Sequence, residues 1–244
     1  MKALPEHQKA LLVLQSNDNH IAQLAHRRET IPQRQALLAV LAQLRDFSQT
    51  LVTRNGVLED AKLELSRIDD DVKVVDERIA RDTERITNSS SMKDIQALES
   101  ELTSLATRKN NLEESELVVM QTVEDAELLV AQAMAERAVV EVERVALAAT
   151  ISQSEDEIDR ERDAEIADRA RIADALPEDL LALYEKQRAR YGIGAALLTR
   201  GVSGGSGMKL NETDLNAIRN AAADDVVMCP DSSCILVRTN ESGL

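Results

Sequence analysis

Apolar residues recur at a strict seven-residue spacing between residues 37 and 86. This first series comprises Leu37, Leu44, Leu51, Leu58, Leu65, Val72, Ile79 and Ile86. A second series, three residues further on, is mostly apolar and comprises Val40, Phe47, Arg54, Ala61, Ile68, Val75 and Asp82. Alternating steps of three and four residues place both series on one face of a helix, which predicts a coiled coil.

Another heptad pattern follows a short polar segment. Residues 87–91 read Thr-Asn-Ser-Ser-Ser, a composition typical of a turn. The apolar series after it comprises Ile95, Leu98, Leu102, Leu105, Leu112, Val119, Val123, Ala126, Val130, Ala133, Val140, Leu147, Ile151 and Ile158. Because so short a turn folds the second helix back along the first, we expect an antiparallel hairpin in which residue i lies near residue ~180 − i.

Proline and glycine positions divide the chain into three predicted parts. Residues 1–176 are expected to form the antiparallel coiled-coil hairpin, with its turn near 87–92 and a kink near 31–32, where a proline removes a helical hydrogen bond. Residues 177–190 are expected to form a neck helix. Residues 191–244 are expected to form a separate small domain.

This last part has the pattern of a small α+β domain. Short apolar runs at 195–198, 226–228 and 235–237 predict small strands. Asn211, followed by Asp214, predicts a capped helix of about two turns. The predicted fold class is therefore mainly α, a long antiparallel coiled-coil helical hairpin followed by a small α+β domain.

Composition agrees with a thin, two-helix core. Aromatic residues make up 1% of the chain and charged residues 30%. Large aromatic side chains normally contribute much of a globular core, so a single compact globule is not expected. The net charge of −15 makes non-specific binding to nucleic acid or to an anionic membrane unfavourable.

The sequence shows no signal for export or membrane insertion. The N-terminal residues lack an apolar core followed by a cleavage site, and no stretch approaches the roughly 20 apolar residues of a spanning helix. The two cysteines, Cys229 and Cys234, do not form a secreted disulfide framework. We therefore expect a cytoplasmic protein that does not contact membranes.

Several segments resemble one bacterial family. They are the stretch Leu-Pro-Glu-Asp-Leu-Leu-Ala-Leu-Tyr-Glu at 176–185, Gly-x-Gly-Ala-Ala at 192–196, the ending Cys-Pro-x-x-x-x-Ile-Leu-Val-Arg-Thr at 229–239, and the Glu/Leu-rich runs at 96–102 and 112–120. Together they resemble the coiled-coil hairpin proteins that carry a C-terminal four-cysteine (C4-type) zinc ribbon, most closely the actinobacterial branch. The resemblance covers essentially the whole chain and implies a zinc-ribbon-like fold for residues 191–244.

The resemblance also implies a degenerate zinc site. The family ribbon binds Zn²⁺ through two Cys-x-x-Cys pairs. Here the first pair is replaced by Ser203 and Ser206, and the second retains Cys229 but has Ser232 as its partner, with Cys234 two residues later. Serine hydroxyls are poor zinc ligands at neutral pH, so we expect no cofactor and no zinc.

Three interpretations of the two thiols remain open. In the first, Cys229 and Cys234 are two ordinary thiols. In the second, they form a disulfide, which a reducing cytoplasm disfavours. In the third, they bind a metal ion shared between two chains. We expect the small domain to keep its fold without metal. Its expected core comprises Leu197, Leu198, Leu210, Leu215, Ile218, Val226, Val227, Ile235 and Val237.

One basic and aromatic cluster lies around the neck helix. It comprises Lys186, Arg188, Arg190 and Arg200, with Tyr184 and Tyr191 interleaved. Such residues can hold a phosphate backbone and stack a base. The alternative is that Tyr184 packs inside the neck and the basic residues form a solvated face.

These patterns lead to two functional hypotheses. No catalytic constellation is present, so no enzyme activity is expected. The first hypothesis is a non-enzymatic adaptor or scaffold that binds protein partners through a rod and a small head, and that could form homo-oligomers. The second is a protein that binds RNA or DNA through the basic neck and the ribbon-like head. Relatives in other bacteria are linked to transcripts, secretion and flagellar partners, as the resemblance implies.

Overall fold

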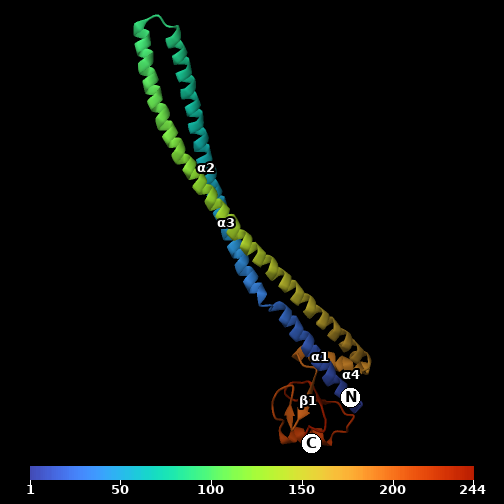
Figure 1. Ribbon diagram of the computed structural model, residues 1–244. Helices are drawn as coiled ribbons and strands as arrows, with labels where there is room; N and C mark the ends of the chain where they lie inside the picture. Colours follow the sequence, from blue (N-terminus) through green and yellow to red (C-terminus); the bar gives the residue numbers. More distant parts are fainter. The chain divides into compact units, whose positions relative to one another are not determined.

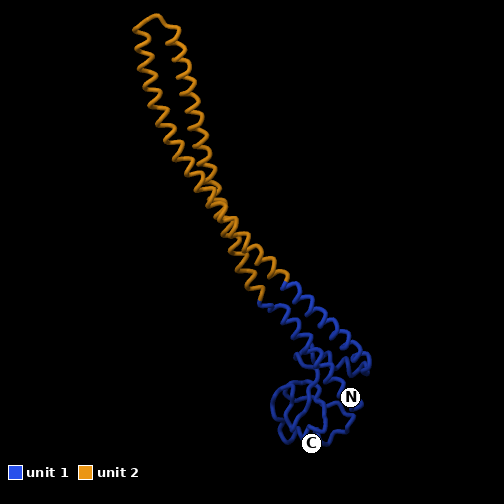
Figure 2. The backbone as a smooth tube through the Cα atoms, in the orientation of Figure 1, with its two compact units in different colours: residues 1–32, 150–244 blue, residues 33–149 orange.

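The computed structural model describes residues 1–244. The helices are α1 (Pro5–Glu29), α2 (Gln33–Asn88), α3 (Met92–Asp174), α4 (Glu178–Tyr191) and α5 (Glu212–Asn220). The strands are β1 (Ala195–Thr199), β2 (Val202–Ser203), β3 (Val227–Met228) and β4 (Ile235–Val237) (Figure 1). The chain divides into two compact units, residues 33–149 and residues 1–32 with 150–244 (Figure 2).

In the unit of residues 33–149, α2 and the first part of α3 run antiparallel as a helical hairpin. Cross-helix ion pairs set its register: Arg78 Nη2 lies 2.7 Å from Glu101 Oε1, and Lys62 Nζ lies 2.9 Å from Glu127 Oε1. The partner of Arg78 is therefore within one residue of the predicted position 180 − i, whereas the partner of Lys62, further from the turn, lies nine residues beyond it. Every predicted apolar position on α2 and α3 is buried or half-buried, which confirms the predicted hairpin.

The polar residues of the α2 seam are satisfied locally. Asp82 is 1% exposed and accepts hydrogen bonds from Arg78 Nε at 2.9 Å and Arg85 Nη1 at 3.2 Å. Arg54 Nη1 donates to the carbonyl oxygen of Leu129 on α3. A buried carboxylate is tolerated because its charge is paired and hydrogen-bonded.

In the other unit, α1 packs against the last part of α3. Leu11, Leu14 and Leu24 are buried on α1. Asn17 Nδ2 donates to Glu165 Oε2 at 2.7 Å, and Arg28 Nε lies 3.1 Å from an Asp159 carboxylate oxygen. The helical ladder stops at residues 30–32, as expected from a proline that has no N–H to donate.

The C-terminal strands form one four-stranded sheet in the order β2-β1-β4-β3. β1 pairs parallel with β4, whereas the other neighbours are antiparallel. α5 lies in the crossover, and its N-cap Asn211 Oδ1 accepts from the backbone N–H of Asp214 at 2.8 Å. The three predicted strands and the capped helix are confirmed, while β2 was not expected from the sequence.

The sheet packs with helices from both ends of the chain. One face shares a core with α1, the end of α3 and α4, comprising Leu11, Leu14, Leu176, Leu180, Tyr184, Ala195, Ile235 and Val237. The other face packs with α5, comprising Ala196, Leu198, Leu210, Leu215, Ile218, Cys229, Cys234 and Leu236. Its stability therefore depends on helices outside residues 191–244.

The expected core of the sheet domain needs a correction. Leu197, Val226 and Val227 are only half-buried. Cys229, Cys234 and Leu236, which were not expected in the core, are 0–2% exposed. The reason is that consecutive β4 residues are covered on both faces, so the whole run 235–237 is buried rather than every second residue.

None of the helices combines the length and the apolar composition that crossing a bilayer requires.

Candidate functional site

The structure gathers three of the four ribbon positions, together with Cys234. Cys229 Sγ lies 3.2 Å from Ser203 Oγ and accepts from the backbone N–H of Ser232 at 3.4 Å. Ser232 Oγ lies 3.2 Å from Cys234 Sγ. The Ser206 hydroxyl instead accepts from the N–H of Met208 within its own loop. The cluster is therefore closed by hydrogen bonds among hydroxyls, thiols and backbone.

Backbone geometry at this cluster depends on a glycine. A methyl group on Gly205 would collide with Cys234 Sγ and Ser232 Oγ. The N–H of Gly205 donates to Ser203 Oγ at 3.2 Å. Gly205 thus lets the β2 loop approach the loop before β4.

The two thiols differ in acidity. Burial alone would raise the pKa of Cys229, but its hydrogen bonds with Ser203 and Ser232 hold that pKa below its ordinary value. Burial raises the pKa of Cys234. Cys229 is therefore the first of the pair to lose its proton.

This donor set does not fit a structural zinc ion. Structural Zn²⁺ sites need four thiolate or imidazole ligands, occasionally carboxylates, in a tetrahedron. Here the four predicted ribbon positions supply one thiol and three hydroxyls, and the hydroxyls of Ser203 and Ser232 are engaged with the thiols. No group of three or more His, Cys, Asp or Glu residues in the chain is arranged to hold a metal ion.

The neck helix α4 is joined to α1 and α3 through one buried carboxylate. Asp18 on α1 accepts from Tyr184 OH at 2.6 Å, Arg169 Nε at 2.6 Å and Arg188 Nη1 at 3.0 Å. Arg169 also pairs with Glu185. Burial and the bond to Asp18 raise the pKa of the Tyr184 phenol, so Tyr184 remains a neutral donor.

Gln15 extends the same network to the sheet. Its Oε1 accepts from the N–H of Gly194 at 2.7 Å and lies 3.3 Å from Tyr184 OH. A side chain at position 194 would collide with the Tyr184 ring. The close approach of backbone and ring explains the glycine.

This arrangement changes the expected nucleic-acid cluster. Tyr184 is fully buried, so it cannot stack a base, and Arg188 is engaged by Asp18 and Glu185. Lys186, Arg190 and Arg200 are exposed, and the guanidinium of Arg190 lies 5.1 Å from the centroid of the Tyr191 ring. Of the six residues, only Arg190 and Tyr191 form an exposed basic and aromatic pair.

A surface that the sequence reasoning missed lies on α3. Seven exposed apolar residues follow steps of three and four: Leu128, Ala131, Ala135, Ala138, Val142, Val145 and Ala149. Leu128 is 58% exposed, Val142 70% and Val145 53%. We call this set the α3 stripe. It spans roughly 30 Å and has the spacing of a coiled-coil seam without a partner.

One exposed apolar residue of α2 lies near one end of the α3 stripe. Lys62 and Glu127 each follow a seam residue directly and pair across the hairpin, so this edge of α2 faces the corresponding edge of α3. Leu41 lies on that edge of α2 and is 44% exposed. In the same register it is level with Ala148, one turn from Val145. Leu41 is therefore an exposed apolar residue near the end of the α3 stripe and is not a member of it.

The charges around the α3 stripe are mostly negative. Residues 121–149 contain Glu124, Asp125, Glu127, Glu136, Glu141 and Glu143 against Arg137 and Arg144. A partner surface with basic residues flanking an apolar strip would complement it.

The sequence contained a signal for this stripe. The second series of steps, from Leu128 to Ala149, is as regular as the buried series on α3. Because four of its seven residues are alanine, this series is no more apolar than the helix around it. Only the burial seen in the structure distinguishes the covered series from the exposed one.

Comparison with known proteins places the chain among bacterial hairpin proteins. Residues 14–192 match the family described as "CT398-like coiled coil hairpin domain". The uncharacterized proteins MT2288 and Rv2229c, from two strains of Mycobacterium tuberculosis, are each 32% identical over 242 residues, which is 98% of this chain and of theirs. The matched family region ends before β1, so the match does not show a zinc ribbon.

Solved structures agree with this placement. A Mycobacterium smegmatis protein superposes with a TM-score of 0.87 at 28% identity and covers 98% of this chain and 100% of its own. CT398 from Chlamydia trachomatis has a TM-score of 0.63 at 17% identity, covering 95% and 97%, and is similar in fold.

Proposed function

The chain belongs to the CT398-like coiled coil hairpin domain family, and from that premise we propose that it is a non-enzymatic scaffold whose hairpin binds an amphipathic helix of a partner protein. The observation that carries this proposal is the α3 stripe. An apolar strip of this length and regularity, left in water, is characteristic of an interaction surface.

The spacing of the stripe defines the shape of the partner. Steps of three and four residues match the holes into which a second helix inserts its own side chains. The alanines allow close helix approach, while Leu128, Val142 and Val145 supply the larger apolar contacts. A helix of about six turns would cover the stripe from end to end.

Charge defines the rest of the partner. With six acidic and two basic residues over residues 121–149, the surface favours a helix with Lys or Arg beside its apolar strip. A second copy of this chain would bring the same acidic residues together, so a different protein is the better occupant.

Site-specific photo-crosslinking in living cells tests this proposal. A photoreactive residue replaces Val142 or Val145 on the stripe, and the matched controls replace Val74 and Val118, which are exposed at 60% and 68% on other faces of the hairpin. We expect the same defined protein to cross-link from both stripe positions, to resist nuclease, and to be absent from both controls.

Charge substitution provides the second arm. Val142→Lys should abolish the cross-link formed from position 145, whereas Val74→Lys should leave it unchanged, because lysine is a good helix former and both sites are exposed. Cross-linking only to a second copy of the chain, or only to nucleic acid through Arg190 and Tyr191, would contradict the proposal and favour homo-oligomerisation or the nucleic-acid function respectively.

A further inference from the structure

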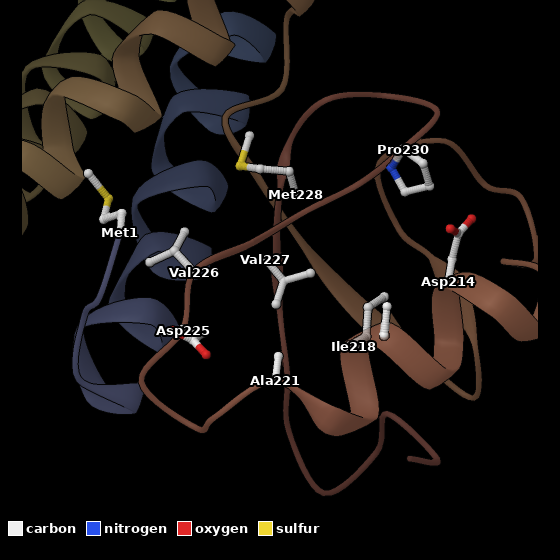
Figure 3. A pocket seen from close by; sticks show the side chains of 10 residues that line it. Met1, Asp214, Ile218, Ala221, Asp225, Val226, Val227, Met228 and Pro230 are labelled. Carbon is white, nitrogen blue, oxygen red and sulfur yellow. The ribbon is translucent and has the colours of Figure 1, made fainter.

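A groove in the sheet domain lies between the edge of the sheet and α5. It is an open pocket of ≈ 370 Å³ whose lining includes Met1, Asp214, Ile218, Asp225, Val227 and Met228. Figure 3 shows the extended segment with Val226, Val227 and Met228 running opposite α5, which carries Asp214 and Ile218. A strand edge facing a helix across an apolar groove is a common peptide-binding arrangement.

The hydrogen-bond pattern leaves part of this edge free. β3 is the terminal strand of the sheet. The N–H of Cys229 donates to the carbonyl oxygen of Cys234, and Met228 is the residue opposite Ile235. In an antiparallel pair, hydrogen-bonded and non-hydrogen-bonded residues alternate. The N–H and C=O of Met228 therefore point away from β4, toward the groove.

The chain already uses this edge for its own N-terminal residues. The N–H of Ala3 donates to the carbonyl oxygen of Asp224 at 2.7 Å. The N–H of Val226 donates to the carbonyl oxygen of Met1 at 3.1 Å. Lys2 Nζ lies 2.9 Å from an Asp224 carboxylate oxygen. Residues 1–3, which include the basic Lys2, are thus already bound as an extended segment along residues 224–226. They do not reach Met228, where the edge of the sheet is unoccupied.

We propose that this groove binds an extended segment of a partner protein as an added strand beside β3. The segment would continue along the edge that Met1–Ala3 begin, with its backbone bonded to the N–H and C=O of Met228. One apolar side chain would contact Ile218 and Val227, whose side chains lie on the α5 face of the sheet. The lining side chains include two carboxylates and no basic side chain. Asp225 already lies 3.9 Å from Lys2 Nζ, whereas Asp214 has no basic partner among the lining residues, so we expect the segment to carry Lys or Arg beside its apolar residue.

This proposal does not depend on the α3 stripe, because the two surfaces lie in different units and recognise different peptide conformations. A helix covers the stripe, whereas the groove admits an extended chain.

Selection from a displayed library of random nonapeptides on the full-length protein tests the groove. Ala217 is exposed and lines the groove, so Ala217→Trp should fill it, while the neighbouring exposed Asn216 is outside the lining and Asn216→Trp is the matched control. We expect enriched peptides in which Lys or Arg lies beside an apolar residue, bound equally by Asn216→Trp and at least tenfold more weakly by Ala217→Trp.

Backbone recognition is tested with the best selected peptide. N-methylation of every second backbone nitrogen of the peptide, at either the odd or the even positions, should weaken binding at least tenfold in one of these two series. The amide resonance of Met228 should shift when the peptide is titrated in. Absence of enrichment, binding unaffected by Ala217→Trp, or enriched sequences with helical spacing of three and four residues would overturn the proposal. The last result would point to the stripe instead.

Discussion

The hairpin of residues 33–149 and the C-terminal sheet domain bury their apolar side chains by different means. On the hairpin, each helix has one partner, so seam residues such as Leu58 and Val75 retain 3–7% exposure. In the sheet domain, Leu198 and Leu236 are covered completely by elements from several parts of the chain, as is Tyr184 of the neck helix α4, which packs against the sheet. Local heptad order therefore suffices to bury the hairpin seam, whereas the sheet domain needs long-range contacts.

The largest expected effect is on the sheet side of this comparison. Tyr184→Ala removes a fully buried ring that contacts Gly194 and bonds to Asp18. We expect a loss of about 3–5 kcal/mol in the free energy of unfolding of that unit. Hydrogen exchange should show faster exchange in α1, α4 and β1 and unchanged exchange in α2.

Tyr184→Phe is the matched control for the hydroxyl alone. It keeps the ring and leaves Asp18 paired with Arg169 and Arg188, so the expected loss is about 1 kcal/mol. Equal losses for the two variants would show that the hydrogen bond, rather than packing, holds α4.

A smaller effect is expected in the hairpin. Leu58 packs with Ala126 and Val130. Leu58→Ala should lower the free energy of unfolding of the hairpin by about 2–3 kcal/mol. This is at the low end for leucine, because a two-helix seam relaxes more easily around a cavity than a closed core does. Exchange should accelerate only in the neighbouring turns of α2 and α3. The control is Val57→Ala, at a 54% exposed position, which should change the free energy of unfolding little. Faster exchange in the sheet domain of the Leu58→Ala variant would contradict the independence of the two units.

The pH dependence of the two cysteines is smaller still. The lowered pKa of folded Cys229 means that its thiolate stabilises the folded state, so this contribution is present above the ordinary thiol pKa near 9 and is lost as pH falls through the folded pKa. The raised pKa of Cys234 has the opposite sign, and stability falls as pH rises above about 9.

Thermal unfolding between pH 7 and 10 under reducing conditions measures both contributions. Cys229→Ser should remove the rise in Tm with pH, and Cys234→Ser should remove the fall at the upper end. Identical profiles for the two variants would show that the thiols are not differentiated by their hydrogen bonds.

The smallest expected effect is that of metal removal. Because Ser203, Cys229, Ser232 and Cys234 bond to one another, a strong chelator should leave the unfolding of the sheet domain unchanged. The measurement is equilibrium denaturation by urea with and without chelator, together with metal analysis of the purified protein. A chelator-induced loss of stability, together with metal in the purified protein, would contradict this prediction.

Prediction from sequence succeeded where contacts are periodic and local. The seam residues, the interruption at Pro32 and the Asn211 cap depend on spacing within a few turns, and each is present as expected. It was incomplete for the sheet domain. The burial of Leu236 and the cysteines, and the half-exposure of Leu197, depend on which faces of a small sheet α1, α4 and α5 cover.

The candidate surfaces show the same division. Heptad spacing identifies both the buried and the exposed series on α3, but two series of similar regularity cannot both face α2, and the sequence does not state which does. The roles of Arg188 and Tyr184 were similarly open, since a basic and aromatic cluster is compatible with either a surface or a core.

By itself the sequence determined the helices, their antiparallel pairing and the absence of a complete set of zinc ligands, because these follow from periodicity and residue type. Only the tertiary structure decided which apolar strip of α3 stays exposed, that Asp18 draws Tyr184, Arg169 and Arg188 into the interior, and that the β3 edge is left open at Met228. Burial and pairing depend on residues up to 225 positions apart, such as Met1 and Val226, whose backbones are hydrogen-bonded, and no local pattern encodes such contacts.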